Sequence, residues 1–157
     1  MTKESGLQWL RELLWWTITF ILAMLVLLPI YGTIGNDYLK MNLLMIVTAI
    51  TYFRFIIYLN YVPYLHHLYT RVVLIVVAAV GFWQFIRKMQ DFMYVVDNYT
   101  ISTFLSPDKM FVDGDAVQRS FLYFKQEYLL FNISVLILTI VLVLRTISSL
   151  WKLGKTL

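Results

Sequence analysis

Residues 129–144 read LLFNISVLILTIVLVL, a run with no charged side chain and three polar ones. An α-helix rises about 1.5 Å per residue and the hydrocarbon core of a bilayer is about 30 Å thick, so about 20 mostly apolar residues span it. Three earlier stretches have the same character. We therefore predict an all-α integral membrane protein with four transmembrane helices, at about residues 13–31, 41–61, 64–86 and 129–150.

The composition agrees with this architecture. Hydrophobic residues make up 61% of the 157 residues and charged residues 14%, against about 45–50% and about 25% in soluble domains. The length predicts a single four-helix transmembrane domain covering residues 1–157. The chain has no cysteine, which excludes disulfides and thiolate metal sites.

The segments outside the spans carry helix-start signals. Ser5 and Gln8 have capping-box spacing, which predicts a short N-terminal interfacial helix that turns into the first span. Asp115 and Gln118 have the same spacing, and no stop signal follows before Gly154. We expect a long fourth helix of about 35 residues and about 52 Å, which projects out of the bilayer. Residues 89–128 are predicted to form an extramembrane loop with partly helical structure.

The turn between the second and third spans is predicted at residues 60–63. Proline at the first position of a helix is pre-set for a helix start, so we expect the third helix to begin at Pro63. Since His66 and His67 would then lie about 100° apart on one helix, they do not suit a shared metal ion.

The charge distribution predicts an orientation. Four spans place both termini on one side. Basic residues on short segments set the orientation, and long loops count less. The terminal side carries Lys3, Arg11, Arg71, Arg145 and Lys152. Both termini are therefore predicted to be cytoplasmic and the loop 89–128 to be outside, in a bacterial inner membrane or an organelle membrane.

Three arginines are the candidate binding residues. Arg54 lies inside the second span, where a charge costs a few kcal/mol on insertion scales. Its side chain either snorkels to a lipid phosphate, forms a structural ion pair or serves a functional site. Arg71 and Arg145 share its leaflet, and Glu12 is the single nearby acid. Anionic lipid headgroups, or a carboxylate from a partner protein, are expected to supply the missing charge; an anionic substrate is a third option.

Aromatic side chains are the candidate docking surface. The stretch before residue 105 is apolar for a loop. The start of the fourth helix carries a stripe at steps of four and three: Val117, Phe121, Phe124, Tyr128, Phe131, Val135 and Leu138. We expect partner docking at Phe92, Tyr99, Phe104, Phe121, Phe124 and Tyr128. Asn132 and the threonines within the spans are interpreted as interhelical hydrogen bonds.

These features favour a non-catalytic membrane subunit or scaffold of a larger membrane protein complex. No motif for catalysis or for a metal is recognisable, no cofactor is expected, and the scattered basic residues do not indicate nucleic-acid binding. The expected partners are the lipid bilayer, anionic phospholipids and other membrane protein subunits. The alternative is a homo-oligomeric channel or pore with Arg54 on the pore-lining helix. A haem or quinone subunit is a third class, although the chain has only two histidines.

Overall fold

The structure, a computed structural model, describes residues 3–65, 67–106 and 114–154. Four long helices make up most of it: α1 (Lys3–Leu27), α2 (Asn36–Tyr58), α3 (Leu68–Asn98) and α4 (Gly114–Gly154). Three short 3-10 turns connect them: η1 (Leu28–Ile30), η2 (Pro63–Leu65) and η3 (Ile101–Phe104). Each long helix is long and apolar enough to cross a membrane. The predicted all-α, four-helix architecture is confirmed.

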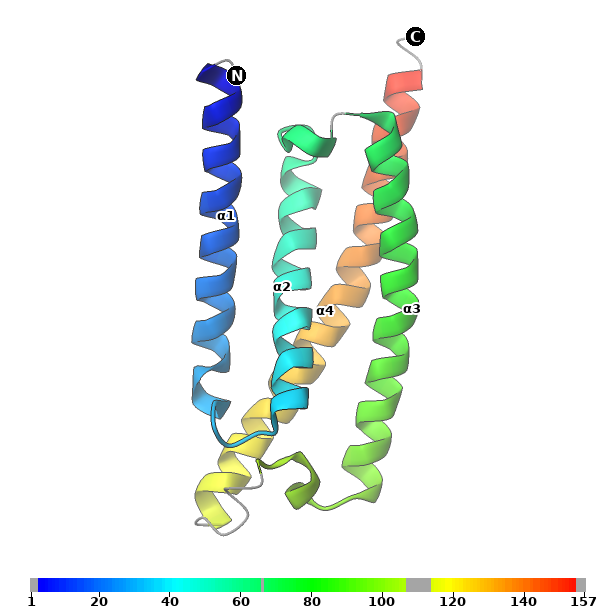
Figure 1. The fold of residues 1–157 in the computed structure, drawn as a ribbon. Coiled ribbons are helices and arrows are strands. Elements are labelled where there is room, and N and C mark those ends of the chain that lie inside the picture. Colours follow the sequence, from blue (N-terminus) through cyan, green and yellow to red (C-terminus); the bar gives the residue numbers. More distant parts are fainter. Residues whose placement is uncertain (1–2, 66, 107–113, 155–157) are drawn as a thin grey trace.

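The helices form an open bundle. Helices α1, α2 and α3 stand side by side, and α4 crosses behind α2 at a slant (Figure 1). At its start α4 lies near the end of α1, and at its end it lies beside α3. Helix α4 packs mainly against α2 and α3, whereas α1 packs mainly against α2. Both termini lie at the same end of the molecule (Figure 1).

The N-terminal segment differs from its prediction in one respect. The expected interfacial helix and the first span are one continuous helix, α1, with no turn between them. Residues 7–14 contain only helix-compatible side chains and no proline or glycine, so nothing in the local sequence breaks the helix. The break comes at Pro29, inside η1, and Gly32 completes the turn with φ of +79°.

The start of the third helix was predicted wrongly. Pro63 opens the 3-10 turn η2 rather than α3. The backbone of His67 is extended (φ −80°, ψ 142°), so α3 begins at Leu68. His66 lies outside the described residues. A proline fixes its own φ, which suits a 3-10 turn as well as an α-helix.

The helices next to the predicted loop are longer than expected. Helix α3 extends to Asn98, and α4 has 41 residues, or about 60 Å. The described part of the connection is therefore short. Two hydrogen bonds tie it to the α1–α2 loop, from the Gly35 N–H to the Phe104 carbonyl (2.8 Å) and from the Ser106 N–H to the Thr33 carbonyl (2.9 Å).

The buried face of α4 follows the predicted stripe and then departs from it. Phe124, Tyr128 and Val135 of the stripe are buried within the chain, and Asn132 and Thr139 are buried in place of Phe131 and Leu138. The Thr139 hydroxyl donates to the Val135 carbonyl one turn earlier. Because this bond stays within α4, the polar side chain enters the core without needing a partner helix. The hydroxyls of Thr17, Thr19, Thr51 and Thr146 do the same. The interhelical bonds predicted for Thr17, Thr19, Thr51 and Thr139 are therefore wrong.

Candidate functional site

Arg54 forms an ion pair within its own chain. Its Nη2 donates to the Oε1 of Glu12 on α1. Both residues are buried: Arg54 is 6% exposed and Glu12 3%. Of the three interpretations of Arg54, the structure selects the structural ion pair. Glu12 thus supplies the counter-charge of Arg54, and the pore alternative stays a prediction.

Aromatic side chains surround this ion pair. The Arg54 guanidinium carbon lies 5.4 Å from the centroid of the Trp15 ring, within cation–π range. Tyr64, on η2, is close to the pair: burial raises the pKa of its phenol, and the Glu12 charge raises it further. Nearby, the Arg11 Nη2 donates to the Tyr61 carbonyl at 2.8 Å. Two polar contacts thus fasten the first half of α1 to the end of α2.

Arg71 is buried, but its partners are neutral. It is 4% exposed. Its Nε donates to the Leu65 carbonyl (2.7 Å), its Nη1 to the Ser149 hydroxyl (2.5 Å) and its Nη2 to the Asn60 side-chain oxygen (3.2 Å). These contacts join η2, the α2–α3 turn and α4. Within the described residues, no carboxylate forms an ion pair with this guanidinium.

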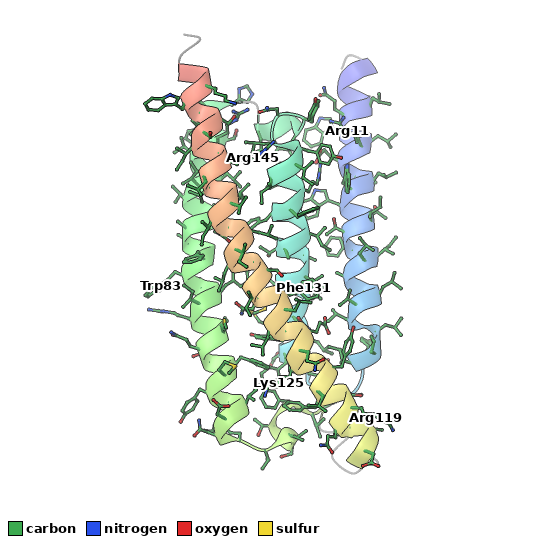
Figure 2. All side chains as sticks on the ribbon, turned by 180° about the vertical axis from the view of Figure 1, so that it is seen from behind. Arg11, Trp83, Arg119, Lys125, Phe131 and Arg145 are labelled. Carbon is green, nitrogen blue, oxygen red and sulfur yellow. The ribbon has the colours of Figure 1, made fainter. Side chains whose placement is uncertain are left out.

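Arg145 is exposed and borders a cavity. Its Nη2 has one long contact, 3.5 Å, with the Ile57 carbonyl. The cavity has a volume of about 510 Å³ and lies between the ends of α2 and α4. Its lining consists of Ile56, Leu59, Asn60, Val141, Leu144, Arg145, Ser148, Ser149 and Lys152. We call it the α2/α4 cavity. Figure 2 shows Arg145 and Arg11 toward one end of the bundle, and Arg119 toward the other.

The predicted docking residues are mostly interior. Phe92, Phe104, Phe121, Phe124 and Tyr128 are each at most 8% exposed. They pack on one another and on Tyr38 as an aromatic cluster: Phe92 stacks on Tyr128 with ring centroids 4.0 Å apart, and Phe104 lies 5.1 Å from Phe121. A side chain that fills the core of its own chain is not available to a partner. The docking prediction is therefore corrected for these five residues.

Tyr99 is the exception. It is 56% exposed and touches Tyr94 with ring centroids 6.3 Å apart. Its docking role stays a prediction.

Glu127 was missed as an interior residue. The stripe at steps of four and three leaves Glu127 on another face of α4, yet Glu127 is 6% exposed. Its Oε1 accepts a hydrogen bond from the Asn42 Nδ2 of α2 at 3.1 Å. The other oxygens of this pair, Glu127 Oε2 and Asn42 Oδ1, are buried without a hydrogen-bond partner. Its place next to Tyr128 in the stripe was the available signal.

Asn132 bears out the prediction of a contact between helices. Its Nδ2 lies 3.4 Å from the Phe85 carbonyl of α3 and 3.7 Å from the Met45 sulfur of α2. It therefore joins three helices at the centre of the bundle, where it is fully buried. An amide in such a place fixes the relative positions of the helices, because a shifted register would leave it unpaired.

An open wedge separates α1 from α4. A cavity of about 530 Å³ lies there, lined by Trp15, Leu22, Ala49, Ile50, Phe53, Arg54, Ile57, Tyr58, Phe131, Ser134 and Leu138. At its floor, on α2, Phe53 is 57% exposed and Ile57 45%. We call this surface the α1/α4 wedge.

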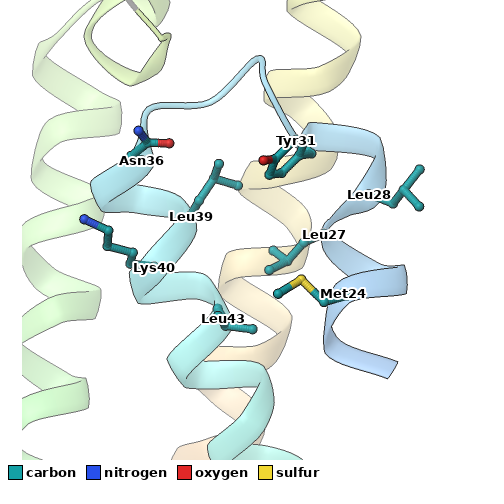
Figure 3. Close-up of a pocket in the computed structure, with 8 residues that line it drawn as sticks. All are labelled: Met24, Leu27, Leu28, Tyr31, Asn36, Leu39, Lys40 and Leu43. Carbon is teal, nitrogen blue, oxygen red and sulfur yellow. The ribbon is translucent and has the colours of Figure 1, made fainter. Parts of the chain in front are cut away.

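A third cavity, of about 490 Å³, lies between the end of α1 and the start of α2. Figure 3 shows Leu27 and Met24 of α1 opposite Leu39 and Leu43 of α2, with Lys40 farther from α1. Five of the eight lining side chains are Leu or Met, and the other three are Tyr31, Asn36 and Lys40.

Metal ligands do not gather anywhere in the described residues, where no three His, Asp or Glu side chains come together. Comparison with known protein families, with characterised proteins and with solved structures found no match to this chain. A proposal about function must therefore be argued from the geometry of the chain itself.

Proposed function

We propose that this chain is a non-catalytic integral membrane subunit or scaffold of a larger membrane protein complex. The observation that supports this most directly is the α1/α4 wedge. Helix α1 packs mainly against α2, and its other faces carry large exposed side chains such as Leu10, Leu13 and Trp16. A helix that is apolar on every face is suited to contact with lipid or with the helices of a partner protein.

The wedge favours a partner helix over lipid alone for a physical reason. Two polar contacts, Glu12 with Arg54 and Arg11 with Tyr61, fasten the first half of α1 to α2 and the turn after it rather than to α4. The gap is therefore built into the bundle. In a membrane, van der Waals packing drives helix association. The wedge has aromatic and aliphatic side chains on α1, α2 and α4, so it gives a helix of a partner protein more contact than a flat face would give.

Site-specific photocrosslinking in native membranes tests the proposal. A benzophenone amino acid at Phe53, in the wedge, is expected to yield a discrete protein adduct. The matched control is Val80 on α3, which is 59% exposed and thus as accessible as Phe53 but lies outside the wedge. At Val80 we expect adducts with lipid and no discrete protein band.

Three outcomes are distinguishable. A Phe53 adduct with a different protein, recovered in fixed ratio, supports the subunit proposal. An adduct with a second copy of this chain would replace it with the homo-oligomer. Lipid adducts at both positions, from membranes in which the chain is folded and at natural abundance, would overturn it.

A further inference from the structure

Arg71 presents an electrostatic problem that the described chain leaves unsolved. A guanidinium stays charged in proteins, and this one is 96% removed from solvent, being 4% exposed. Its three hydrogen bonds go to a backbone carbonyl, a hydroxyl and an amide oxygen. Neutral oxygens solvate a buried cation but do not cancel its charge. Arg54, by contrast, has Glu12.

The α2/α4 cavity adjoins this uncompensated charge. Ser149 and Asn60, which accept hydrogen bonds from Arg71, both belong to its lining. Each still has a donor: the Ser149 hydroxyl proton and the Asn60 amide protons. An anion that accepts these protons would be coupled to Arg71 through one intervening group. Such polarised hydrogen bonds strengthen one another in a low dielectric.

The cavity also has cations of its own. Arg145 and Lys152 line it, and among the described residues no acidic side chain does. Arg145, Ser148, Ser149 and Lys152 recur at steps of three, one and three along α4, so they share one face of the helix. The lining thus combines two cationic groups and two hydroxyls on a single face.

The remaining lining side chains of the cavity are mostly apolar, and on α4 they lie on one side of the polar residues Arg145, Ser148, Ser149 and Lys152. Ile56 lies in α2 and Leu59 directly after it, and Val141 and Leu144 precede Arg145 on α4. Along α4 the cavity is therefore aliphatic toward the middle of the helix and cationic toward its end. This order matches an amphiphile whose charged head lies at the membrane surface and whose chains run inward.

We propose that the α2/α4 cavity binds an anionic phospholipid. The headgroup phosphate accepts hydrogen bonds from Arg145, Lys152 and the serine hydroxyls, and it supplies the negative charge that Arg71 lacks. The first part of an acyl chain lies against Val141 and Leu144. This proposal does not depend on the proposed subunit function.

Native mass spectrometry of the full-length protein, released from nanodiscs, provides the test. The probes are phosphatidylglycerol, phosphatidylcholine and inorganic phosphate. The variant is Arg145→Gln with Lys152→Gln, which leaves Arg71 and its partners intact. The matched control is Arg119→Gln with Lys125→Gln, which removes the same charge from the other end of the same helix (Figure 2).

The wild type and the control are expected to retain phosphatidylglycerol in preference to phosphatidylcholine. The Arg145→Gln, Lys152→Gln variant should lose about 30-fold in affinity, which corresponds to about 1 kcal/mol for each basic residue near an anionic surface. Circular dichroism checks that its helix content is unchanged.

Several results would overturn the proposal. One is equal retention of the two lipids, and another is equal loss in the variant and the control. Displacement of phosphatidylglycerol by inorganic phosphate would reassign the site to a free anion. A protein partner crosslinked through an acidic segment at Ser148, with no lipid retained, would reassign it to a protein interface.

Discussion

Two buried carboxyl groups have opposite electrostatic surroundings. Glu12 faces the guanidinium of Arg54, whereas Glu127 faces the amide of Asn42. Removing one member of a buried ion pair strands the other charge and costs about 3–5 kcal/mol. A buried carboxyl group that has only an amide partner gains little stability from its charge. Glutamine has almost the same shape as glutamate, so it can replace such a residue with little change in packing. The same substitution should therefore have different effects at the two positions.

We expect Glu12→Gln to lower the free energy of unfolding by about 3–5 kcal/mol. Glu127→Gln should change it by less than about 1 kcal/mol, because no described cation loses its partner. Unfolding by SDS in mixed micelles measures both. Equal destabilisation by the two variants would contradict this view of Glu127.

Among the helices and turns, the short turn η3 contributes a side chain to the core. Helices α3 and α4 diverge toward this end of the bundle, and η3 lies between them (Figure 1). Phe104 is fully buried and contacts Phe92, Phe121 and Phe124. Aromatic pairs of this kind add about 0.5–1.5 kcal/mol each beyond the burial of area. The connection is thus part of the core.

Phe104→Ala is expected to destabilise the protein by about 3–5 kcal/mol, as is usual when a buried aromatic side chain is removed. Tyr99→Ala, five residues earlier and exposed, serves as the control and should cost less than about 0.5 kcal/mol. SDS unfolding again gives both values. If Tyr99→Ala instead weakens co-purification of a partner without changing stability, the docking role predicted for Tyr99 gains support. A small effect of Phe104→Ala would show that η3 does not hold the cluster together.

At the scale of the molecule, charge is distributed unequally between the two ends of the bundle. The end with both termini carries Arg11, Arg71, Arg145 and Lys152. At the opposite end α2 and α4 begin and α3 ends (Figure 1). Acidic residues lie there beside basic ones: Asp37 in the first turn of α2, Asp115 in the first turn of α4, and Asp91 and Asp97 toward the end of α3. Basic residues near the ends of spans favour the cytoplasmic side. The prediction of cytoplasmic termini therefore applies to one defined end of the structure.

Cysteine labelling tests this orientation without background, because the chain has no cysteine of its own. Ser102→Cys, on η3, is expected to react with a membrane-impermeant maleimide added outside intact cells. Lys152→Cys should react only after permeabilisation. Labelling of both positions from one side would be incompatible with four membrane-spanning helices. Reversed labelling would overturn the orientation and leave the fold intact.

The positions of the helices, and some of the polar residues that matter, follow from the sequence. A run of apolar residues long enough to cross a bilayer is a local property, so the number of spans, the long α4 and its end near Gly154 followed from residues close together in the chain. Arg54 also stood out locally, as a charge within an apolar run. So did the excess of arginine over acid near the termini, where Arg145 lines the α2/α4 cavity and Arg71 adjoins it through Ser149 and Asn60.

Which residues come into contact depends on how the helices pack in the folded chain. Glu12 and Arg54 are 42 positions apart, and no periodicity relates them. On helices that are apolar on every face, the pattern does not say which face is inward. The slant of α4 across α2 makes that choice: it buries Glu127 and the aromatic cluster at one end, and it opens the wedge at the other. The physical reason is that membrane helices associate by shape and by specific polar contacts, which depend on side chains brought together from distant parts of the chain.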